Sequence, residues 1–239
     1  MSDIKNKVAF ITGGSKGIGF GVAKVLMLEG MKVVITSRSQ ESANKAATEL
    51  NELGSGEAFG VASDVKSLDS QQQAVAQAID KYGQIDLLLA NAGVGHFASI
   101  EDLTEEQWND TIDTNLTGVF FSVKAALDAL KKTKGFIITI SSLAGTNFFP
   151  SGSAYNASKF GLTGFSQAVM LDLRNHGIRV STIMPGSVAT HFNNHTPSVK
   201  DAWKIQPEDI GEMVSGLMKM NPRTLPSKLE VRPSMPPSK

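Results

Sequence analysis

The sequence predicts an α/β protein in which a parallel sheet of about seven strands carries helices on both faces. Short apolar runs without polar alternation recur along the chain, and this pattern is typical of strands that are buried on both faces. Helical patterns lie between these runs, and such alternation favours a doubly wound sheet with right-handed crossovers. With 239 residues, 41% of them hydrophobic and 19% charged, the chain is expected to form one domain over residues 1–239.

The strand-like runs follow one another at regular spacing. Six of them predict buried strands, at residues 8–12, 32–36, 58–62, 85–91, 135–141 and 178–184. A seventh strand is expected at 228–232, "KLEVR". No internal repeat or low-complexity segment interrupts the series.

The segments between the strands contain recognisable helix starts. Thr104 with Gln107 matches a capping box, and Pro207 followed by two acidic residues suits the first turn of a helix. Two long helices are expected around 104–132 and 153–176.

Composition excludes several classes of protein. The chain has no cysteine, which excludes disulfides, thiolate metal sites and a cysteine nucleophile. The formal net charge of +0 gives no global field that would attract nucleic acid or an anionic membrane surface. The N-terminal stretch lacks the apolar run of a signal peptide, and no apolar run reaches the ~20 residues that span a bilayer. We therefore expect a cytoplasmic protein without a nucleic-acid or membrane partner.

In a doubly wound sheet, ligands bind at the carboxyl ends of the strands, so the residues that follow each strand are the candidates for function. The first strand is followed by "TGGSKGIG" at 12–19, which leads into the helical segment 18–30. Small residues let the backbone approach a pyrophosphate, and the helix N-terminus presents free N–H groups to it. A tight strand-to-helix turn without a ligand is the alternative interpretation.

The end of the second strand discriminates between cofactors. A carboxylate near this point accepts hydrogen bonds from the ribose of NAD, whereas a 2′-phosphate requires cations. The chain offers Ser37 and Arg38 here, with Lys16 in the glycine turn as a second cation. An arginine can hold a phosphate through two hydrogen bonds, which favours NADP over NAD. The alternative is that both cations are solvated surface charges.

Two further strand ends carry polar or small residues. Asp64 follows the third strand, where its carboxylate could accept a hydrogen bond from an adenine amino group or could cap the helix that starts near Ser67. The fourth strand is followed by "ANAGVG" at 90–95, whose small residues suit a chain that passes close to a ribose. Taken alone, both features are also typical of loops.

The fifth strand ends in a serine pair, the second of which is Ser142. Tyr155 follows thirteen residues later, and Lys159 lies one helical turn after Tyr155. Reduction of a ketone leaves negative charge on oxygen, so a proton donor must lie within ~3 Å of that oxygen. Tyrosine can supply the proton, although its ordinary pKa is ~10. A neighbouring ammonium would lower that pKa, and the serine hydroxyl could hold the substrate oxygen. The alternative is an amphipathic helix with a half-buried tyrosine.

Taken together, these motifs resemble the short-chain dehydrogenase/reductase family. The resemblance covers residues 7 to about 190 and includes "TGGSKGIG", "NAG" at 91–93, "DTNLTG", "ISSLAG", "YNASK" and "PGSVAT" at 185–190. It implies a Rossmann fold with a cofactor half at about 1–140 and a catalytic half at about 141–239.

The resemblance also implies a role for individual residues. The implied catalytic residues are Asn115, Ser142, Tyr155 and Lys159: Tyr155 as acid/base, Ser142 to orient the carbonyl, Lys159 to bind the nicotinamide ribose and tune Tyr155, and Asn115 to hold a water in a proton relay. The implied NADP(H)-binding residues are Gly13, Ser15, Lys16, Gly17, Ile18, Gly19, Ser37, Arg38, Asp64, Val65, Asn91, Ala92, Gly93, Tyr155, Lys159, Pro185, Gly186, Val188 and Thr190. No metal site is expected.

The substrate is less strongly constrained. The candidates for the pocket lining are Val94, His96, Asn147, Phe148, Phe149, His191 and Phe192, and the two adjacent phenylalanines would suit an alkyl or aromatic ketone. His96 could equally be a surface residue. A basic run of Lys131, Lys132 and Lys134 could receive an acidic carrier protein, but lysines at a helix end more often complement the helix dipole.

Three functional hypotheses follow. The first is an NADP(H)-dependent oxidoreductase that acts on a small-molecule ketone/secondary alcohol pair, either a 3-oxoacyl thioester or a small carbonyl compound or 3-hydroxy acid. The second is a non-catalytic NADP-binding regulator, which would not need Tyr155 and Lys159 together. The third is another Rossmann enzyme such as a methyltransferase, which would not need Ser142 and Tyr155. By resemblance, the two long helices are expected to form a homodimer or homotetramer.

Overall fold

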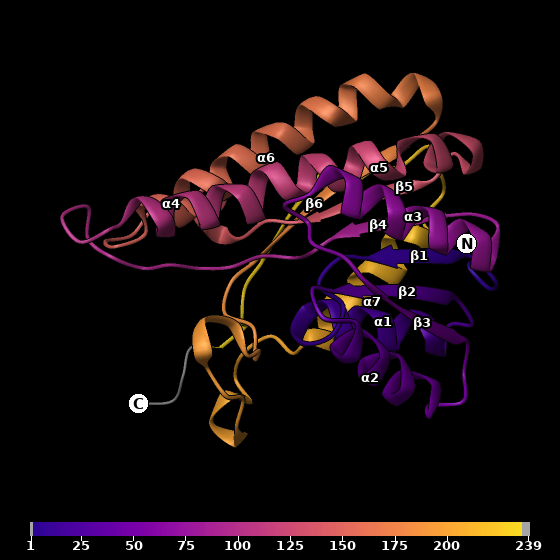
Figure 1. Cartoon of the computed structure of the whole chain (residues 1–239), viewed down its shortest axis with the longest axis horizontal. Coiled ribbons are helices and arrows are strands. Elements are labelled where there is room, and N and C mark those ends of the chain that lie inside the picture. The colour runs from indigo at the N-terminus through magenta and orange to yellow at the C-terminus, as the bar shows by residue number, and fades with distance from the viewer. Residues whose placement is uncertain (1, 236–239) are drawn as a thin grey trace.

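The computed structural model describes residues 2–235, and it contains one seven-stranded sheet in which every strand pair is parallel (Figure 1). The strands are β1 (Val8–Ile11), β2 (Lys32–Ser37), β3 (Glu57–Ala62), β4 (Leu87–Ala90), β5 (Phe136–Ile140), β6 (Arg179–Pro185) and β7 (Lys228–Val231). Their spatial order is β3-β2-β1-β4-β5-β6-β7. The predicted fold class is confirmed, and each of the seven predicted strands overlaps an observed one.

Helices cover both faces of the sheet. They are α1 (Gly17–Leu28), α2 (Gln40–Asn51), α3 (Leu68–Tyr82), α4 (Glu105–Ile112), α5 (Gly118–Thr133), α6 (Ser153–Leu173) and α7 (Pro207–Lys219). Figure 1 shows α1, α2 and α7 on one side of the sheet and α3, α4, α5 and α6 on the other. A separate hydrophobic core lies on each face, because the buried side chains of each strand alternate between the two.

The helix starts are set by local side chains. Ser39 caps α2, Ser67 caps α3, and Thr104 with Gln107 forms the predicted capping box of α4. Asp64 does not cap α3, because its carboxylate instead accepts a hydrogen bond of 2.9 Å from the backbone nitrogen of Lys66. The aspartate therefore remains at the carboxyl edge of the sheet.

The long helix expected around 104–132 is interrupted. A π-helical turn at Asp113–Thr117 separates α4 from α5. Such a turn adds a residue to the hydrogen-bonded ring and rotates the side chains that follow, and π-turns of this kind frequently occur at functional sites. The turn buries Asn115 completely, although a mid-helix asparagine usually faces solvent.

The order of the strands creates a crevice at one place in the sheet. Ile11 at the end of β1 pairs with Ile35 of β2 on one side and with Leu89 of β4 on the other. The chain therefore leaves β1 and β4 side by side, and their connections run to opposite faces of the sheet. This is the point at which doubly wound sheets bind ligands.

The connection between β6 and α7 forms an excursion beyond the sheet, which Figure 1 shows in orange below the strands. It contains short 3₁₀ turns at Phe192–Asn194 and Val199–Asp201, and its two ends are joined by a bridge between Val188 and Ile205.

Among the helices of residues 2–235, none has both the length and the apolar character needed to cross a bilayer.

Candidate active site

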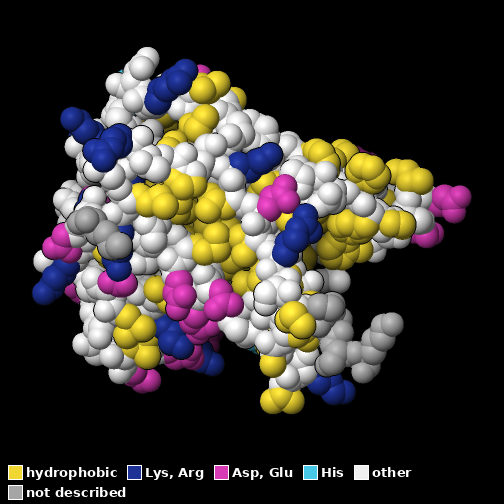
Figure 2. All heavy atoms as spheres, turned by 180° about the vertical axis from the view of Figure 1, so that it is seen from behind, with side chains coloured by type: hydrophobic (Ala, Val, Ile, Leu, Met, Phe, Trp, Pro, Cys, Tyr) yellow, Lys and Arg dark blue, Asp and Glu magenta, His cyan; other side chains and the backbone are white. Residues whose placement is uncertain are grey.

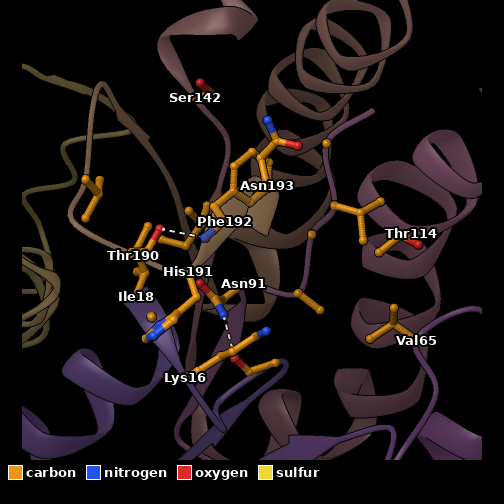
Figure 3. A pocket seen from close by; sticks show the side chains of 18 of the residues that line it. Lys16, Ile18, Val65, Asn91, Thr114, Ser142, Thr190, His191, Phe192 and Asn193 are labelled. Carbon is orange, nitrogen blue, oxygen red and sulfur yellow. Dashed lines mark hydrogen bonds between the residues drawn. The ribbon is translucent and has the colours of Figure 1, made fainter. Parts of the chain in front are cut away.

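A cleft of about 750 Å³ runs along the carboxyl edge of the sheet (Figure 3). Of the residues predicted to bind a cofactor, all except Gly19 line this cleft, and Ser142 lines it as well. Lining residues come from both the segment 1–140 and the segment 141–239. Asn115 is not part of the lining.

The glycine turn lets three backbone segments approach one another closely. Gly13 has a φ of +64°, and a Cβ on it would lie 2.9 Å from the Cα of Ala92. A Cβ on Gly19 would lie 2.7 Å from the Nδ2 of Asn91. Gly19 does not line the cleft, but its lack of a side chain leaves room for Asn91. The first turn of α1 has no side-chain cap, in contrast to α2, α3 and α4, and its N–H groups remain available to an anion.

Asn91 joins the glycine turn to the end of β4. Its Nδ2 donates hydrogen bonds to the carbonyl oxygens of Thr12 (2.9 Å) and Gly13 (3.1 Å), and Figure 3 shows its side chain among the residues of the turn. The Thr12 hydroxyl in turn accepts hydrogen bonds from the backbone nitrogens of Asn91 (3.0 Å) and Ala92 (3.2 Å). The side chain of Asn91 therefore holds the glycine turn and the end of β4 together where they line the cleft.

The end of the cleft beside β2 is cationic. Lys16 and Arg38 both line it and are exposed, and neither forms an ion pair within the part of the chain that the structure describes. Thr36, which also lines the cleft, has a buried hydroxyl oxygen without a hydrogen-bond partner among these residues. Together with the uncapped first turn of α1, these groups fit a dinucleotide that carries an additional phosphate near Arg38.

Tyr155 and Lys159 project from the first half of α6 into the inner end of the cleft. The Nζ of Lys159 donates a hydrogen bond of 3.0 Å to the carbonyl oxygen of Ile140, the last residue of β5, and lies 5.6 Å from the centre of the Tyr155 ring. Lys159 is 4% exposed, and this burial lowers its pKa to about 8.

Ser142 follows β5 and caps the short turn Leu143–Gly145, with its Oγ accepting a hydrogen bond of 3.1 Å from the Ala144 nitrogen. Burial raises the pKa of Tyr155 to about 12, and interaction with the Ser142 side chain opposes this rise. We expected the Lys159 ammonium to bring that pKa down toward neutrality. The dominant influence is instead the burial of the phenol, which disfavours the phenolate and keeps Tyr155 protonated at neutral pH.

Asn115 holds the loop after β4 from behind the cleft. Its Oδ1 accepts a hydrogen bond of 2.8 Å from the Val94 nitrogen, and its Nδ2 donates to the Val94 oxygen (2.9 Å) and to the Ser158 hydroxyl (3.1 Å). Ser158 donates in turn to the carbonyl oxygen of Tyr155 at 2.8 Å. The side chain of Asn115 thus links the β4 loop to the helix that carries Tyr155, and a water-holding role for Asn115 stays a prediction.

An aromatic cluster surrounds the phenol, and its central residue was missed from the sequence. The Phe97 ring lies 5.3 Å from the Tyr155 ring, 6.4 Å from Phe192 and 5.9 Å from Phe149, centre to centre. Phe192 also lies 5.8 Å from Tyr155. Sequence patterns carry no signal for Phe97, because it lies in an irregular loop. Only its distance along the chain from "NAG", close after the end of β4, could have suggested it.

The other residues predicted to line the substrate pocket are divided between two environments. Val94, His96, His191 and Phe192 line the cleft, whereas Asn147, Phe148 and Phe149 do not. Phe148 is 86% exposed and Phe149 is 43% exposed, so the two adjacent rings do not form the predicted wall of the cleft. The Nε2 of His96 lies 2.9 Å from Asp110, whose other oxygen pairs with Lys66 at 3.1 Å, so His96 belongs to a hydrogen-bonded polar network at the rim of the cleft.

Comparison with known proteins agrees with this geometry. A family model described as short chain dehydrogenase matches residues 7–201. The 3-oxoacyl-[acyl-carrier-protein] reductase of Synechocystis sp. is 37% identical over 197 residues, which cover 82% of this chain and 79% of that protein. Trans-4-hydroxycyclohexanecarboxylate dehydrogenase of Sinomonas cyclohexanicum is 37% identical over 192 residues, or 78% of this chain and 74% of that protein.

A solved structure shows the same likeness in three dimensions. The alcohol dehydrogenase from the archaeon Thermococcus sibiricus, in complex with 5-hydroxy-NADP, matches with a TM-score of 0.90 and 30% identity, covering 98% of this chain and 100% of that one. Because the family model spans most of the chain and the fold extends over nearly all of it, the chain belongs to the short-chain dehydrogenase family of oxidoreductases.

Proposed function

We propose that this protein is an NADP(H)-dependent oxidoreductase that interconverts a ketone and a secondary alcohol, with Tyr155 as the acid/base. The observation that carries the proposal is the partly buried phenol of Tyr155, which lines the cleft beside Ser142 and has its ring centre 5.6 Å from the Lys159 ammonium. Bound NADPH would supply the hydride that reduces the carbonyl carbon.

The chain's own residues would manage the proton and the substrate oxygen. The Ser142 hydroxyl would hold the carbonyl oxygen, and Tyr155 would donate a proton to that oxygen as negative charge develops on it. Because burial keeps the pKa of Tyr155 at about 12, the phenol is a neutral acid at physiological pH. Lys159, fixed by its hydrogen bond to Ile140, would stabilise the phenolate that remains.

The choice of NADP over NAD rests on the cationic end of the cleft. Lys16 and Arg38 line the cleft near the end of β2, where a 2′-phosphate would require cations, and an arginine fork suits phosphate geometry. The Thermococcus sibiricus relative was solved with 5-hydroxy-NADP, which supports the same choice.

The substrate side of the cleft favours a small carbonyl compound or hydroxy acid over a thioester on a carrier protein. Phe192 lines the cleft beside Tyr155, and Phe97 packs against both rings without lining the cleft itself; together they form an apolar wall that suits an alkyl or aromatic substituent on the ketone. The basic run Lys131, Lys132 and Lys134 lies at the end of α5 that is remote from Asn115. Sixteen helical residues span about 24 Å, so this run does not adjoin the cleft. The relatives named above include both substrate classes.

We also propose that the protein forms a homodimer or homotetramer. Large apolar side chains are exposed on α4, α5 and α6: Trp108, Phe120, Phe160 and Leu171 are 39% to 50% exposed. Figure 2 shows hydrophobic side chains gathered over the end of the molecule where α4 and the start of α6 project. Sedimentation velocity at micromolar concentration should show at least a dimer, and a monomer alone would contradict this.

The function is tested by following oxidation of NADPH and NADH with a panel of ketones, β-keto esters and an acetoacetyl thioester. Turnover with NADPH would support the proposal, and the best substrate would choose between the thioester and the small carbonyl class. The alternative is a regulator that binds NADPH without turnover. It would bind NADPH, oxidise none with any member of the panel, and be indifferent to the loss of Tyr155.

A further inference from the structure

A second hollow lies beside the candidate active site, on the other side of the chain that leaves β6. It has a volume of about 440 Å³ and is lined by Leu143, Gly186, Ser187, Trp203, Arg232, Pro233, Ser234 and Met235. Gly186 and Ser187 line both this hollow and the main cleft, and Leu143 directly follows Ser142. The hollow and the main cleft therefore share the chain segment that follows β6 as a common wall.

The position of Arg232 follows from the sheet. Pro185 of β6 pairs with Val231 of β7, and the Gly186 nitrogen donates a hydrogen bond of 2.8 Å to the Val231 oxygen. Arg232 is thus the first residue after β7, at the carboxyl edge that also carries the glycine turn and Ser142. Gly186 faces the hollow, because a Cβ on it would lie 3.0 Å from the Leu143 side chain and 3.5 Å from that of Pro233.

The hollow carries a single positive charge among its described lining residues. Arg232 is the one charged side chain among the described residues that line it, and Leu143, Trp203, Pro233 and Met235 make its walls largely apolar. The Arg232 guanidinium already pairs with a carboxylate, that of Glu230, at 3.1 Å. Both side chains are substantially exposed, at 57% and 39%, and such an exposed pair contributes little to stability. A ligand carboxylate can therefore replace Glu230 at small cost.

We propose that this hollow is a subsite for a carboxylate of the substrate, held by Arg232 while the reacting carbonyl lies against Ser142 and Tyr155. A single guanidinium with apolar walls matches a monoanion with a hydrocarbon spacer, and an arginine fork binds a carboxylate through two parallel hydrogen bonds. The proposal rests on the proposed function and narrows it to oxo acids and hydroxy acids. The spacer would pass Ser187, which lines both cavities.

The test uses three oxo acids of increasing spacer length, 3-oxobutanoate, 4-oxopentanoate and 5-oxohexanoate, each compared with its methyl ester. The ester keeps the ketone and the spacer but removes the charge. For the full-length protein with NADPH, we expect kcat/KM for at least one acid to exceed that for its ester by tenfold or more. In Arg232→Gln this ratio should fall to about one, mainly through KM, with ester turnover unchanged.

Two further variants separate recognition from general damage. Arg223→Gln removes an exposed arginine that lines neither cavity, and it should leave every acid/ester ratio unchanged. Glu230→Gln removes the carboxylate that competes for Arg232, and it should lower KM for the preferred acid two- to threefold. A ratio that is the same in the wild type and Arg232→Gln, or acids that are no better than esters, would overturn the subsite.

A binding measurement tests the subsite separately from the proposed catalytic function. If no ketone is turned over with NADPH, calorimetric titration of the same acids in the presence of NADP⁺ still tests the subsite. Binding of an acid by the wild type that is lost in Arg232→Gln supports it, and equal or absent binding overturns it.

Discussion

Lys159 donates a hydrogen bond of 3.0 Å to the carbonyl oxygen of Ile140, so the buried ammonium of α6 is anchored to the last residue of β5. Ser142 follows two residues after Ile140. The same strand end therefore holds the lysine and positions the serine, and both side chains lie near the Tyr155 phenol. Because three proposed catalytic side chains lie close together here, single substitutions among them should change the activity measurably.

Replacing Tyr155 by Phe should abolish the proton transfer and leave cofactor binding intact. A positioned general acid contributes roughly 10²- to 10⁴-fold to the rate, so we expect a loss of kcat of that size. NADPH oxidation gives the rate, and NADPH fluorescence gives the binding constant. Tyr82→Phe is the matched control, because Tyr82 is the other tyrosine of the chain and its buried hydroxyl has no partner among residues 2–235. A Tyr155→Phe variant with wild-type turnover would remove Tyr155 from the mechanism.

The burial of Lys159 should make stability depend on pH in a defined direction. Its pKa is lowered from 10.5 to about 8, so between these values the folded protein releases a proton that the unfolded chain retains. The unfolded state then binds more protons, and the free energy of unfolding rises with pH, by roughly 2 to 3 kcal/mol between pH 8 and 10. Above pH 10, the raised pKa of Tyr155 acts in the opposite direction.

This pH dependence is measured by urea unfolding of the wild type and of Lys159→Met at several pH values from 7.5 to 10. The difference in unfolding free energy between the two proteins should change in favour of the wild type as pH rises. A constant difference would mean that Lys159 keeps an ordinary pKa in the folded state.

Arg38→Asp should reverse the preference between cofactors. The substitution removes a cation that we assign to the 2′-phosphate and introduces a carboxylate that suits a ribose 2′-hydroxyl. We expect kcat/KM for NADPH to fall about tenfold to hundredfold, while that for NADH stays equal or rises. Arg174→Asp, an exposed arginine outside the cleft, is the control. An unchanged NADPH/NADH ratio would assign Arg38 to the solvent-exposed surface alone.

Phe97→Ala should weaken the apolar wall beside Tyr155. Loss of one aromatic ring removes roughly 1 to 2 kcal/mol of favourable binding free energy for an aryl group. We therefore expect kcat/KM for an aryl ketone to fall about tenfold, with a smaller change for acetone. Phe148→Ala is the matched control, because Phe148 is 86% exposed and, among the described residues, makes no aromatic contact with Tyr155, Phe97 or Phe192. Equal losses for aryl ketone and acetone would indicate general damage to the site.

Asn115→Ala should destabilise the fold as well as the site. It leaves the backbone nitrogen and oxygen of Val94 without their partner, which costs roughly 1 kcal/mol for these partly buried groups at the cleft. Asn115→Asp retains the acceptor for the Val94 nitrogen and should recover part of that loss. Urea unfolding measures both. Wild-type stability in Asn115→Ala would show that Val94 finds other partners.

Much of this protein is determined by its sequence alone. The apolar runs identify six of the seven strands, because strands buried on both faces require such runs, whereas β7 lies at the edge of the sheet and its residues are exposed or half-buried. The glycine turn and the pair Tyr155 and Lys159 identify the carboxyl edge as the place of function, because parallel strands bring their ends to one edge. These are local patterns, and each depends on residues that are close together in the chain.

The tertiary structure alone decided the rest. The hydrogen bonds of Asn115 to Val94 and Ser158, the contact of Phe97 with Tyr155, and the position of Arg232 beside Gly186 all join segments distant in the chain. The same holds for the pKa of Tyr155, which was expected to be lowered and is instead raised to about 12. Burial is a property of the whole packed molecule, and so its effect on a phenol cannot be derived from the spacing of two residues on one helix.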